Sequence, residues 1–273
     1  MTLSIVTINY NNLEGLKKTL ESVRNQTSGD FEHVLVDGAS TDGSAALIKE
    51  YASPVPYPVK WVSEKDSGIY NAMNKGIRMA SGDYIQILNS GDCLAASNVI
   101  NRMCVALSGN DFPDILYGNM IFVDGNKEYG KSRKVEYSLR QYFTSTLNHD
   151  CAYIRRSLFN EYGLYDEGLK IVSDWKWYLQ AIGFGKVKPV YVNIDVTLFD
   201  CSGISSTNVA LRKAERRKVL EELFPPAILV DYDSHAFEMA QMTRLRSHHL
   251  YGLVWFIERV CSKLEKWGIL KKS

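Results

Sequence analysis

Residues 64–92 read EKDSGIYNAMNKGIRMASGDYIQILNSGD and place a loop, a helix, a strand and an acidic turn in immediate succession. Gly68 interrupts the chain, and apolar residues then recur at the spacing of one helical face until Ser81 and Gly82. Residues 84–88 are a short β-favouring run, and residues 89–92 are a tight turn that ends in the carboxylate of Asp92. We therefore expect a helix of about three turns, followed by a strand with Asp92 at its carboxyl end.

Strands and helices alternate through the first third of the chain. Apolar, β-branched runs predict buried strands at residues 3–8, 31–36 and 59–62. Helical periodicity predicts helices between them at residues 16–23 and 45–51. Such alternation builds a mostly parallel central sheet flanked by helices, so the expected fold class is α/β. The later elements are less regular: a helix at residues 94–107, a hairpin at 114–135 and strands at 151–154 and 185–198.

Composition and charge exclude several classes of protein. Lys and Arg number 32 against 31 Asp and Glu, and a formal charge of +1 argues against nucleic acid binding by bulk charge. The five cysteines form no Cys-x-x-Cys pair and are odd in number, which argues against a zinc site or a disulfide framework and fits a reducing cytosol. No apolar run reaches the ~18 residues of a membrane span, and residues 1–8 lack the basic flank of a signal peptide. We therefore expect a cytoplasmic protein.

Polar side chains stand where the predicted strands end. They are Thr7, Asn9, Asp37, Glu64, Asp66 and Asp92. Because ligands of open α/β sheets bind beyond the carboxyl ends of the strands, a base, a ribose and a diphosphate can be laid across these side chains. Neither the Gly-x-Gly-x-x-Gly of dinucleotide-binding folds nor the Gly-x-x-x-x-Gly-Lys of phosphate loops occurs at these turns.

Asp92 is our candidate ligand for a divalent metal, Mg²⁺ or Mn²⁺. One carboxylate on a rigid strand end suffices when phosphate oxygens and water complete the coordination of a hard cation. The alternative is that residues 89–92 form only a turn that caps the following helix.

Four motifs occur in order along the chain: SIVTINYNN at residues 4–12, VDGASTDGS at 36–44, EKDSGIYNAMNKGI at 64–77 and LNSGD at 88–92. Together they resemble the family 2 glycosyltransferases of the GT-A fold, from residue 3 to about residue 200. The resemblance implies a catalytic domain at residues 1–207, in which 1–92 are the nucleotide-sugar half and 93–207 the acceptor half. Residues 208–273 would be a helical C-terminal extension, and residues 199–207 a loop that closes over the donor.

The resemblance also implies which residues serve the donor, a nucleotide-diphospho-sugar. They are Thr7, Asn9, Asp37, Asp66, Asn74, Lys75 and Asn89, with Asp92 at the position of the metal-binding carboxylate. Gly91 and Asn71 stand where many relatives have aspartate, so we expect weak metal affinity. The residues alone leave other interpretations open, namely a turn-stabilising role for Asp37 and a solvated helix face for Asn74 and Lys75.

Asp174 follows Ser173 at the start of a predicted helix. One interpretation is a first-turn aspartate that complements the helix dipole. The resemblance instead places the general base here, and we expect Trp175 and Trp177 to exclude water and raise the basicity of the carboxylate. His149 resembles a histidine found in a subgroup of the family. We expect it, with Trp175, to contact the acceptor or the diphosphate, or to touch the metal; a structural histidine is the alternative.

The expected activity is that of an inverting glycosyltransferase. It would move a hexosyl or N-acetylhexosaminyl group to a hydroxyl of a saccharide or lipid-linked saccharide, as in bacterial cell-surface polysaccharide synthesis. One alternative is a sugar nucleotidyltransferase, whose Gly-rich basic signature is missing from residues 9–14. The other is a catalytically weak nucleotide-sugar sensor, which the departures at residues 71 and 91 would suit.

An apolar stripe with cations between its members ends the chain. The apolar members are Leu250, Leu253, Val254, Ile257, Val260, Cys261, Leu264 and Trp267. Their spacing predicts an amphipathic helix, which either packs on the catalytic domain or lies on a membrane surface. Trp267 beside Lys266, Lys271 and Lys272 favours peripheral contact with anionic lipid at the inner face of the cell membrane.

Overall fold

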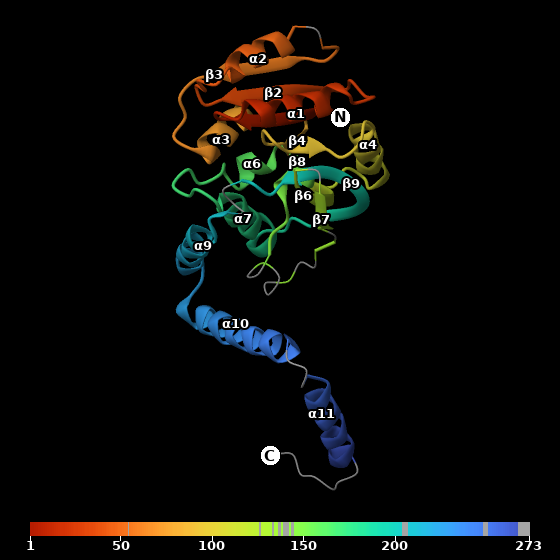
Figure 1. Cartoon of the computed structure of the whole chain (residues 1–273), viewed down its shortest axis with the longest axis vertical. Helices are drawn as coiled ribbons and strands as arrows, with labels where there is room; N and C mark the ends of the chain where they lie inside the picture. Colours follow the sequence, from red (N-terminus) through yellow and green to blue (C-terminus); the bar gives the residue numbers. More distant parts are fainter. Residues whose placement is uncertain are drawn as a thin grey trace. The chain divides into compact units, whose positions relative to one another are not determined.

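The computed structural model describes residues 1–53, 55–125, 127–132, 134–135, 138, 142, 145–203, 207–247 and 251–266. The chain divides into two compact units, Met1–Arg217 and Lys218–Ser273. The first unit contains the sheet, and the elements described in the second unit are helices (Figure 1).

Four parallel strands form one side of the sheet. They are β1 (Leu3–Asn9), β2 (Phe31–Asp37), β3 (Val59–Ser63) and β4 (Tyr84–Ile87), in the spatial order β3-β2-β1-β4. Every residue of β1, β2 and β4 is buried, which explains their apolar character, because helices cover both faces of a parallel sheet.

The helices that connect these strands are α1 (Leu13–Arg24), α2 (Ser44–Tyr51) and α3 (Ile69–Met79). The crossover from β1 to β2 runs across the sheet in the opposite direction from the crossover from β3 to β4, so α1 and α3 cover opposite faces. The α3 helix approaches the sheet closely at Gly76, where a Cβ atom would come within 2.3 Å of Val6 Cγ1. A larger residue at position 76 would therefore displace the helix.

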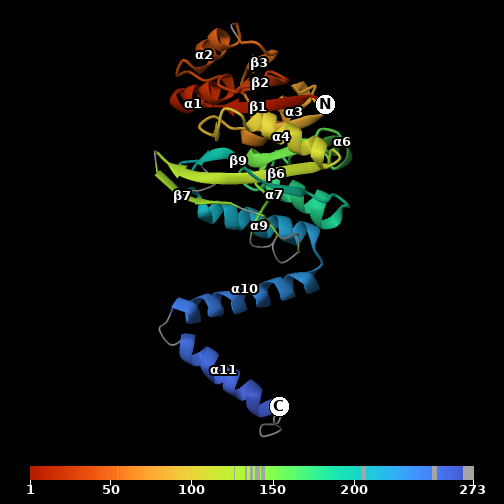
Figure 2. The ribbon, with the colours of Figure 1, turned by 90° about the vertical axis from the view of Figure 1, so that its right-hand side faces the viewer.

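The remaining strands combine both directions. β8 (Ala152–Arg155) lies antiparallel between β4 and β6 (Ile115–Asp124), and β9 (Val190–Asp200) runs parallel to β6. The strand β7 (Lys127–Lys131) forms a hairpin with β6, which Figure 2 shows from the side. The α/β fold predicted from the sequence, with helices flanking a central sheet, is confirmed, and its parallel strands are concentrated in the first half.

Local patterns give way to long-range pairing in the second half. The helix expected from residue 94 begins only as α4 (Val99–Gly109), because residues 93 and 94 form β5 (Cys93–Leu94) and pair with β9. The helix expected at Asp174 is α7 (Ser173–Tyr178), which continues as the π-helical segment η2 (Leu179–Phe184). Two short elements, η1 (His149–Cys151) and α6 (Leu158–Glu161), precede and follow β8.

The α9 helix (Val209–Leu223) spans the division between the two units. The first unit continues past residue 207, the predicted end of the catalytic domain, because the Glu215 carboxylate accepts the backbone N–H groups of Lys170 and Ile171. The second unit also contains α10 (Pro226–Ser247) and α11 (Tyr251–Lys266). Among the described residues, no helix combines the length and apolar character that a bilayer crossing needs.

Candidate functional site

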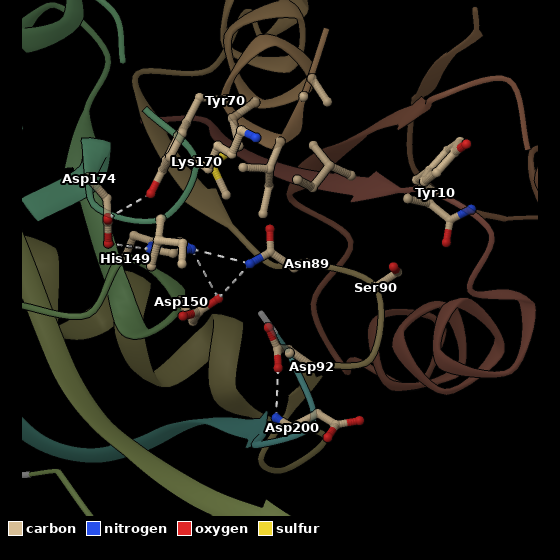
Figure 3. Close-up of a pocket in the computed structure, with 18 of the residues that line it drawn as sticks. Tyr10, Tyr70, Asn89, Ser90, Asp92, His149, Asp150, Lys170, Asp174 and Asp200 are labelled. Atoms are coloured by element: carbon tan, nitrogen blue, oxygen red, sulfur yellow. Dashed lines mark hydrogen bonds and ion pairs between the residues drawn. The ribbon is translucent and has the colours of Figure 1, made fainter. Parts of the chain in front are cut away.

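A cavity of about 1000 Å³ lies beyond the carboxyl ends of β1, β2 and β4. Residues that follow these strands and β3 form one wall, among them Tyr10, Asp66 and Asn89. The second half of the unit supplies the facing wall, which includes His149 and Asp174 (Figure 3). A cavity of this size with converging carboxylates and amides is typical of a small-molecule site.

Asp92 and Asp150 are neighbouring carboxylates in this cavity, with exposed fractions of only 4% and 2%. Burial raises the pKa of Asp92 well above its usual value, and the negative charge of Asp150 raises it further. Burial also raises the pKa of Asp150, although the charge of His149 opposes this shift. The backbone N–H of Asp200 donates to Asp92 Oδ1 at 2.8 Å and fixes the orientation of that carboxylate.

This acid pair fits part of a metal site. Hard oxygen ligands suit Mg²⁺ or Mn²⁺, and a cation relieves the repulsion between two close carboxylates. Within the described ranges, no group of three or more His, Cys, Asp or Glu side chains is arranged to hold a metal, so phosphate oxygens and water would complete the shell. Gly91 has a φ of +108°, a conformation in which an aspartate at this position would be strained.

A second group of polar side chains is centred on Asp174 (Figure 3). The Tyr70 hydroxyl donates to Asp174 Oδ1 at 3.0 Å, and His149 Nδ1 lies 3.1 Å from Asp174 Oδ2. On the other side of the ring, His149 Nε2 lies 3.3 Å from Asp150 Oδ1 and beside the amide of Asn89. The imidazole therefore connects the Asp174 carboxylate to the acid pair.

Electrostatic interactions keep Asp174 ionised. Burial lowers the pKa of His149, but the negative charge of Asp150 and the interaction with Asp174 outweigh it and raise this pKa to about 9. The imidazole is therefore protonated at neutral pH. For Asp174, burial by itself would raise the pKa. The hydrogen bond and the charge of His149, together with the hydrogen bond from Tyr70, outweigh burial and hold the pKa of Asp174 below its usual value.

The expectation that Trp175 and Trp177 raise the basicity of Asp174 is wrong in direction, because the neighbouring imidazolium outweighs burial. Trp175 lines the cavity and donates its indole N–H to the Tyr142 carbonyl at 2.8 Å. Trp177 is not among the lining residues and stacks on Phe159, with ring centroids 4.9 Å apart.

The structure brings most of the predicted site residues together. Those that line the cavity are Asn9, Asp66, Asn89, Asp92, His149, Asp174 and Trp175. Four predicted donor-binding residues are not among the lining residues: Thr7, Asp37, Asn74 and Lys75.

Thr7 and Asp37 instead lie fully buried behind the wall. The Thr7 hydroxyl is 3.0 Å from His33 Nε2. The Asp37 carboxylate accepts hydrogen bonds from side chains near the ends of three strands, namely Asn9, Ser40 and Ser63. Hydrogen bonds of this kind fix the loops that form the wall.

Asn74 and Lys75 brace the wall from α3. Asn74 Nδ2 donates to Glu167 Oε1 at 2.8 Å, and the Lys75 ammonium pairs with Glu64 at 2.8 Å. Asn71 Nδ2 donates to the other oxygen of Glu167 at 2.7 Å. An aspartate at position 71 would set a second carboxylate against Glu167, which gives a physical reason for this departure from the family pattern.

The structure also places residues in the cavity wall that no sequence motif predicted. The main ones are Tyr10, Tyr70, Asp150, Lys170, Asp200, Arg212 and Arg216. Asp200 ends a strand, so the strand-end rule that selected Asp92 would also have found it. Of the loop predicted to close over the donor, residues 204–206 lie outside the described residues, whereas Phe199, Asp200, Ser202 and Gly203 line the cavity.

The sequence model of the family described as "Glycosyl transferase family 2" matches residues 4–163. An uncharacterised glycosyltransferase of Mycobacterium tuberculosis is 32% identical over 211 residues, which cover 75% of this chain and 77% of that protein. A PGL/p-HBAD biosynthesis glycosyltransferase of Mycobacterium bovis is 28% identical over 207 residues, which cover 76% of this chain and 80% of that protein. The glycosyltransferase YwdF of Bacillus subtilis, itself uncharacterised, is 28% identical over 276 residues, which cover 97% of this chain and 100% of that protein.

Solved structures share the fold. S. aureus TarS 1-349, in complex with UDP-GlcNAc, matches with a TM-score of 0.60 at 18% identity, over 73% of this chain and 58% of that chain. The mannosyltransferase PcManGT from Pyrobaculum calidifontis, in complex with GDP-Man and Mn²⁺, matches with a TM-score of 0.59 at 18% identity, over 78% of this chain and 61% of that chain. This chain thus spans less than two thirds of either structure. The GT-A fold predicted from the sequence is confirmed.

Substitution of Asp92 by asparagine tests the electrostatic cost of the acid pair. Without divalent metal, Asp92→Asn should unfold at a higher temperature than the parent, because an amide oxygen still accepts the Asp200 N–H while the charge that repels Asp150 is gone. The pKa of Asp92 in the folded protein is raised above 3.8, so ionised Asp92 destabilises the fold at any pH above this raised pKa. The destabilisation disappears as the pH falls from the raised pKa toward 3.8.

The gain should be a few degrees near pH 8 and should shrink as the pH falls, which thermal unfolding in EDTA measures. A variant that is less stable than the parent at every pH would contradict the account of the acid pair.

Proposed function

The chain belongs to glycosyl transferase family 2, and on that premise we propose that it is an inverting glycosyltransferase with a nucleotide-diphospho-sugar donor. It transfers a hexosyl or N-acetylhexosaminyl group to a hydroxyl of a saccharide or lipid-linked saccharide. One observation carries the proposal: an ionised carboxylate, Asp174, and the acid pair of Asp92 and Asp150 face one cavity. Asp174 is suited to accept a proton from an acceptor hydroxyl, and the acid pair is suited to bind a cation that holds the leaving diphosphate.

In the proposed reaction, Asp174 accepts the proton of the acceptor hydroxyl. The acceptor oxygen forms a bond to the anomeric carbon while the bond from that carbon to the diphosphate oxygen breaks, and the nucleoside diphosphate leaves. Tyr70 and His149 hold the carboxylate by one oxygen each, so that its orientation is set before the substrate binds. A divalent cation bound at Asp92 and Asp150 would supply electrostatic stabilisation of the leaving group.

In this proposal the nucleoside binds at the part of the cavity lined by Tyr10, Gly38 and Asp66. The Tyr10 side chain is 66% exposed, and its aromatic face suits stacking on a base. A Cβ atom at Gly38 would come within 2.5 Å of Asp66 Oδ2 and 3.0 Å of Tyr10 Cδ2, so a side chain here would crowd both. Complexes of the fold neighbours with UDP-GlcNAc and with GDP-Man support this class of donor.

A nucleotide-sugar sensor without activity is the rival function. Its support came from the departures at Asn71 and Gly91, and both have structural explanations in the Glu167 contact and the positive φ. The groups needed for displacement, Asp174 and the acid pair, are all present in the cavity. The geometry therefore supports transfer over binding alone.

We also propose that α11 contacts anionic lipid at the cytoplasmic face of the membrane. Leu253, Ile257 and Val260 share one side of the helix and are 54%, 52% and 38% exposed. Exposed apolar side chains at helical spacing, with Arg259 and Lys263 on the same helix, suit the interface of an anionic bilayer. Other members of the predicted stripe and its cations lie outside the described residues: Leu250, Trp267, Lys271 and Lys272.

A panel of UDP-, GDP- and dTDP-sugars tests the donor class and the metal together. The matching donor should raise the unfolding temperature of the parent with Mn²⁺, since a ligand at 100 times its Kd stabilises the folded state by about 2.7 kcal/mol. Asp92→Ala should lose this response because the diphosphate loses its cation. If the donor stabilises the parent just as much in EDTA, the metal has no role in donor binding.

Asp174→Asn should abolish transfer while donor affinity stays unchanged, because the base acts on the acceptor. The expected fall in rate is ~10²–10⁴-fold. Asp111→Asn, which changes an exposed aspartate elsewhere, is the matched control and should transfer like the parent. A transfer rate of Asp174→Asn within about twofold of the parent would exclude the role, since a general base contributes far more.

Flotation with anionic vesicles at low salt tests α11. The parent should float and should be released by high salt, because screening weakens its attraction to anionic headgroups. Ile257→Glu should reduce flotation, whereas Ser262→Glu, which adds the same charge on the other side of the helix, should have a smaller effect. If the parent floats no more than a chain truncated after residue 247, α11 does not bind lipid and only packs against protein.

A further inference from the structure

Three cationic side chains line one part of the cavity: Lys170, Arg212 and Arg216. Arg212 and Arg216 are four residues apart on α9, so they project from the same face of that helix. Lys170 belongs to the loop that leads into α7. In Figure 3 it is labelled near Tyr70 and Asp174, whereas Asp92 and Asp200 lie lower in the view.

A buried carboxylate fixes this cationic group in place. Glu215 is 9% exposed, and its two oxygens accept the backbone N–H groups of Lys170 at 2.7 Å and of Ile171 at 2.8 Å. The contact ties the α9 turn that carries both arginines to the loop that carries Lys170. The same loop is held at its start by Asn74, which exchanges hydrogen bonds with the Tyr165 backbone at 2.9 and 3.0 Å. The three cations therefore sit on a braced frame.

Arg216 lies directly against the proposed base segment. Its guanidinium carbon is 5.0 Å from the centre of the Trp175 ring, and Trp175 follows Asp174 in the chain. Stacking on an indole fixes the plane of a guanidinium, a group whose geometry matches the oxygens of an oxyanion. Within the part of the chain that the structure describes, the Lys170 ammonium has no ion-pair partner.

From this arrangement we propose that Lys170, Arg212 and Arg216 form a phosphate-binding subsite on the acceptor side, and hence that the acceptor carries a phosphate group near its reacting hydroxyl. The inference rests on the proposed function and deepens it. All three cations line the cavity, and the guanidinium forks of the two arginines suit the geometry of a phosphate.

The phosphate bound by the three cations could belong to the acceptor or to the donor, and the geometry of an inverting displacement favours the acceptor. The attacking oxygen and the leaving diphosphate lie on opposite sides of the anomeric carbon. If the diphosphate lies at the acid pair of Asp92 and Asp150, the acceptor lies on the Asp174 side, where Arg216 stacks on Trp175, the next residue in the chain. The cationic group thus faces the acceptor, and a phosphorylated saccharide or a saccharide linked through phosphate is the class that it selects.

Calorimetry of the full chain tests the subsite with the donor site already filled. The protein is saturated with UDP or GDP and Mg²⁺ and then titrated with inorganic phosphate or glucose 1-phosphate. The parent should bind at least one of these probes. Arg212→Gln/Arg216→Gln should weaken that binding by about tenfold or more, since charge-assisted hydrogen bonds are lost, while UDP or GDP affinity stays within about twofold. Arg217→Gln, an exposed arginine on the same helix, is the control and should change neither.

Two results would overturn the proposal. A loss of UDP or GDP affinity in the double variant, with phosphate competing against the nucleotide, would assign the cations to the donor diphosphate. A parent that binds neither phosphate probe below roughly 10 mM, the limit of weak specific binding, would leave no subsite. A parent that binds no nucleotide or nucleotide sugar would instead refute the proposed function, and the phosphate titration would still be read independently. Unfolding temperatures near that of the parent confirm that the variants are folded.

Discussion

The charged imidazole of His149, held between the carboxylates of Asp150 and Asp174, is the interaction on which the rest of the site depends. Without it, the cavity would contain three largely buried carboxylates, with Asp92 as the third, and leaving such a charge uncompensated typically costs about 3–5 kcal/mol. The neighbouring hydrogen bond from Tyr70 to Asp174 joins the two halves of the fold, because Tyr70 belongs to α3 whereas Asp174 and His149 belong to the second half. Stability and the orientation of the proposed base therefore have one source.

The two sides of the cavity differ in how well their carboxylate charges are balanced. At the acid pair, burial raises the pKa of both Asp92 and Asp150, and the negative charge of Asp150 raises that of Asp92 further, so both carboxylates are costly to ionise. Asp174 is already balanced by an imidazolium and a phenol hydrogen bond, and its pKa is lowered. A ligand must therefore bring positive charge to the first side, whereas the second side, near Lys170, accepts a negative group. This difference gives the cavity a direction before any ligand binds.

Local sequence signals were sufficient for the first half of the fold and insufficient for the second. β1, β2 and β4 are buried on both faces and β3 is partly buried, so each is a mostly apolar or β-branched run that can be recognised from neighbouring residues alone. β5 contains only two residues and exists because β9 pairs with it, which no local pattern encodes. The same reason explains why Asp92 could be predicted and Arg212 could not. Asp92 closes the turn that follows a recognisable strand, whereas the α9 turn that carries Arg212 is held at the cavity by the contact of Glu215 with a loop far away in sequence.

The strand-end rule identifies the loops that form the wall but does not say which side chains of those loops face the cavity. Asn9 and Asp37 illustrate the difference, because both follow the rule and hydrogen-bond to each other at 2.9 Å, yet only Asn9 lines the cavity. Hydrogen bonds from Ser40, Ser63 and Asn9 outweigh the effect of burial and lower the pKa of Asp37, so its charge stabilises the folded state at neutral pH and this contribution is lost as the solution is acidified through that pKa. A carboxylate in this position acts on the ligand only through the loops that it holds. Substituting it would therefore disturb binding and stability together, whereas a carboxylate that faces the cavity, such as Asp174, can lose its chemistry while the fold remains.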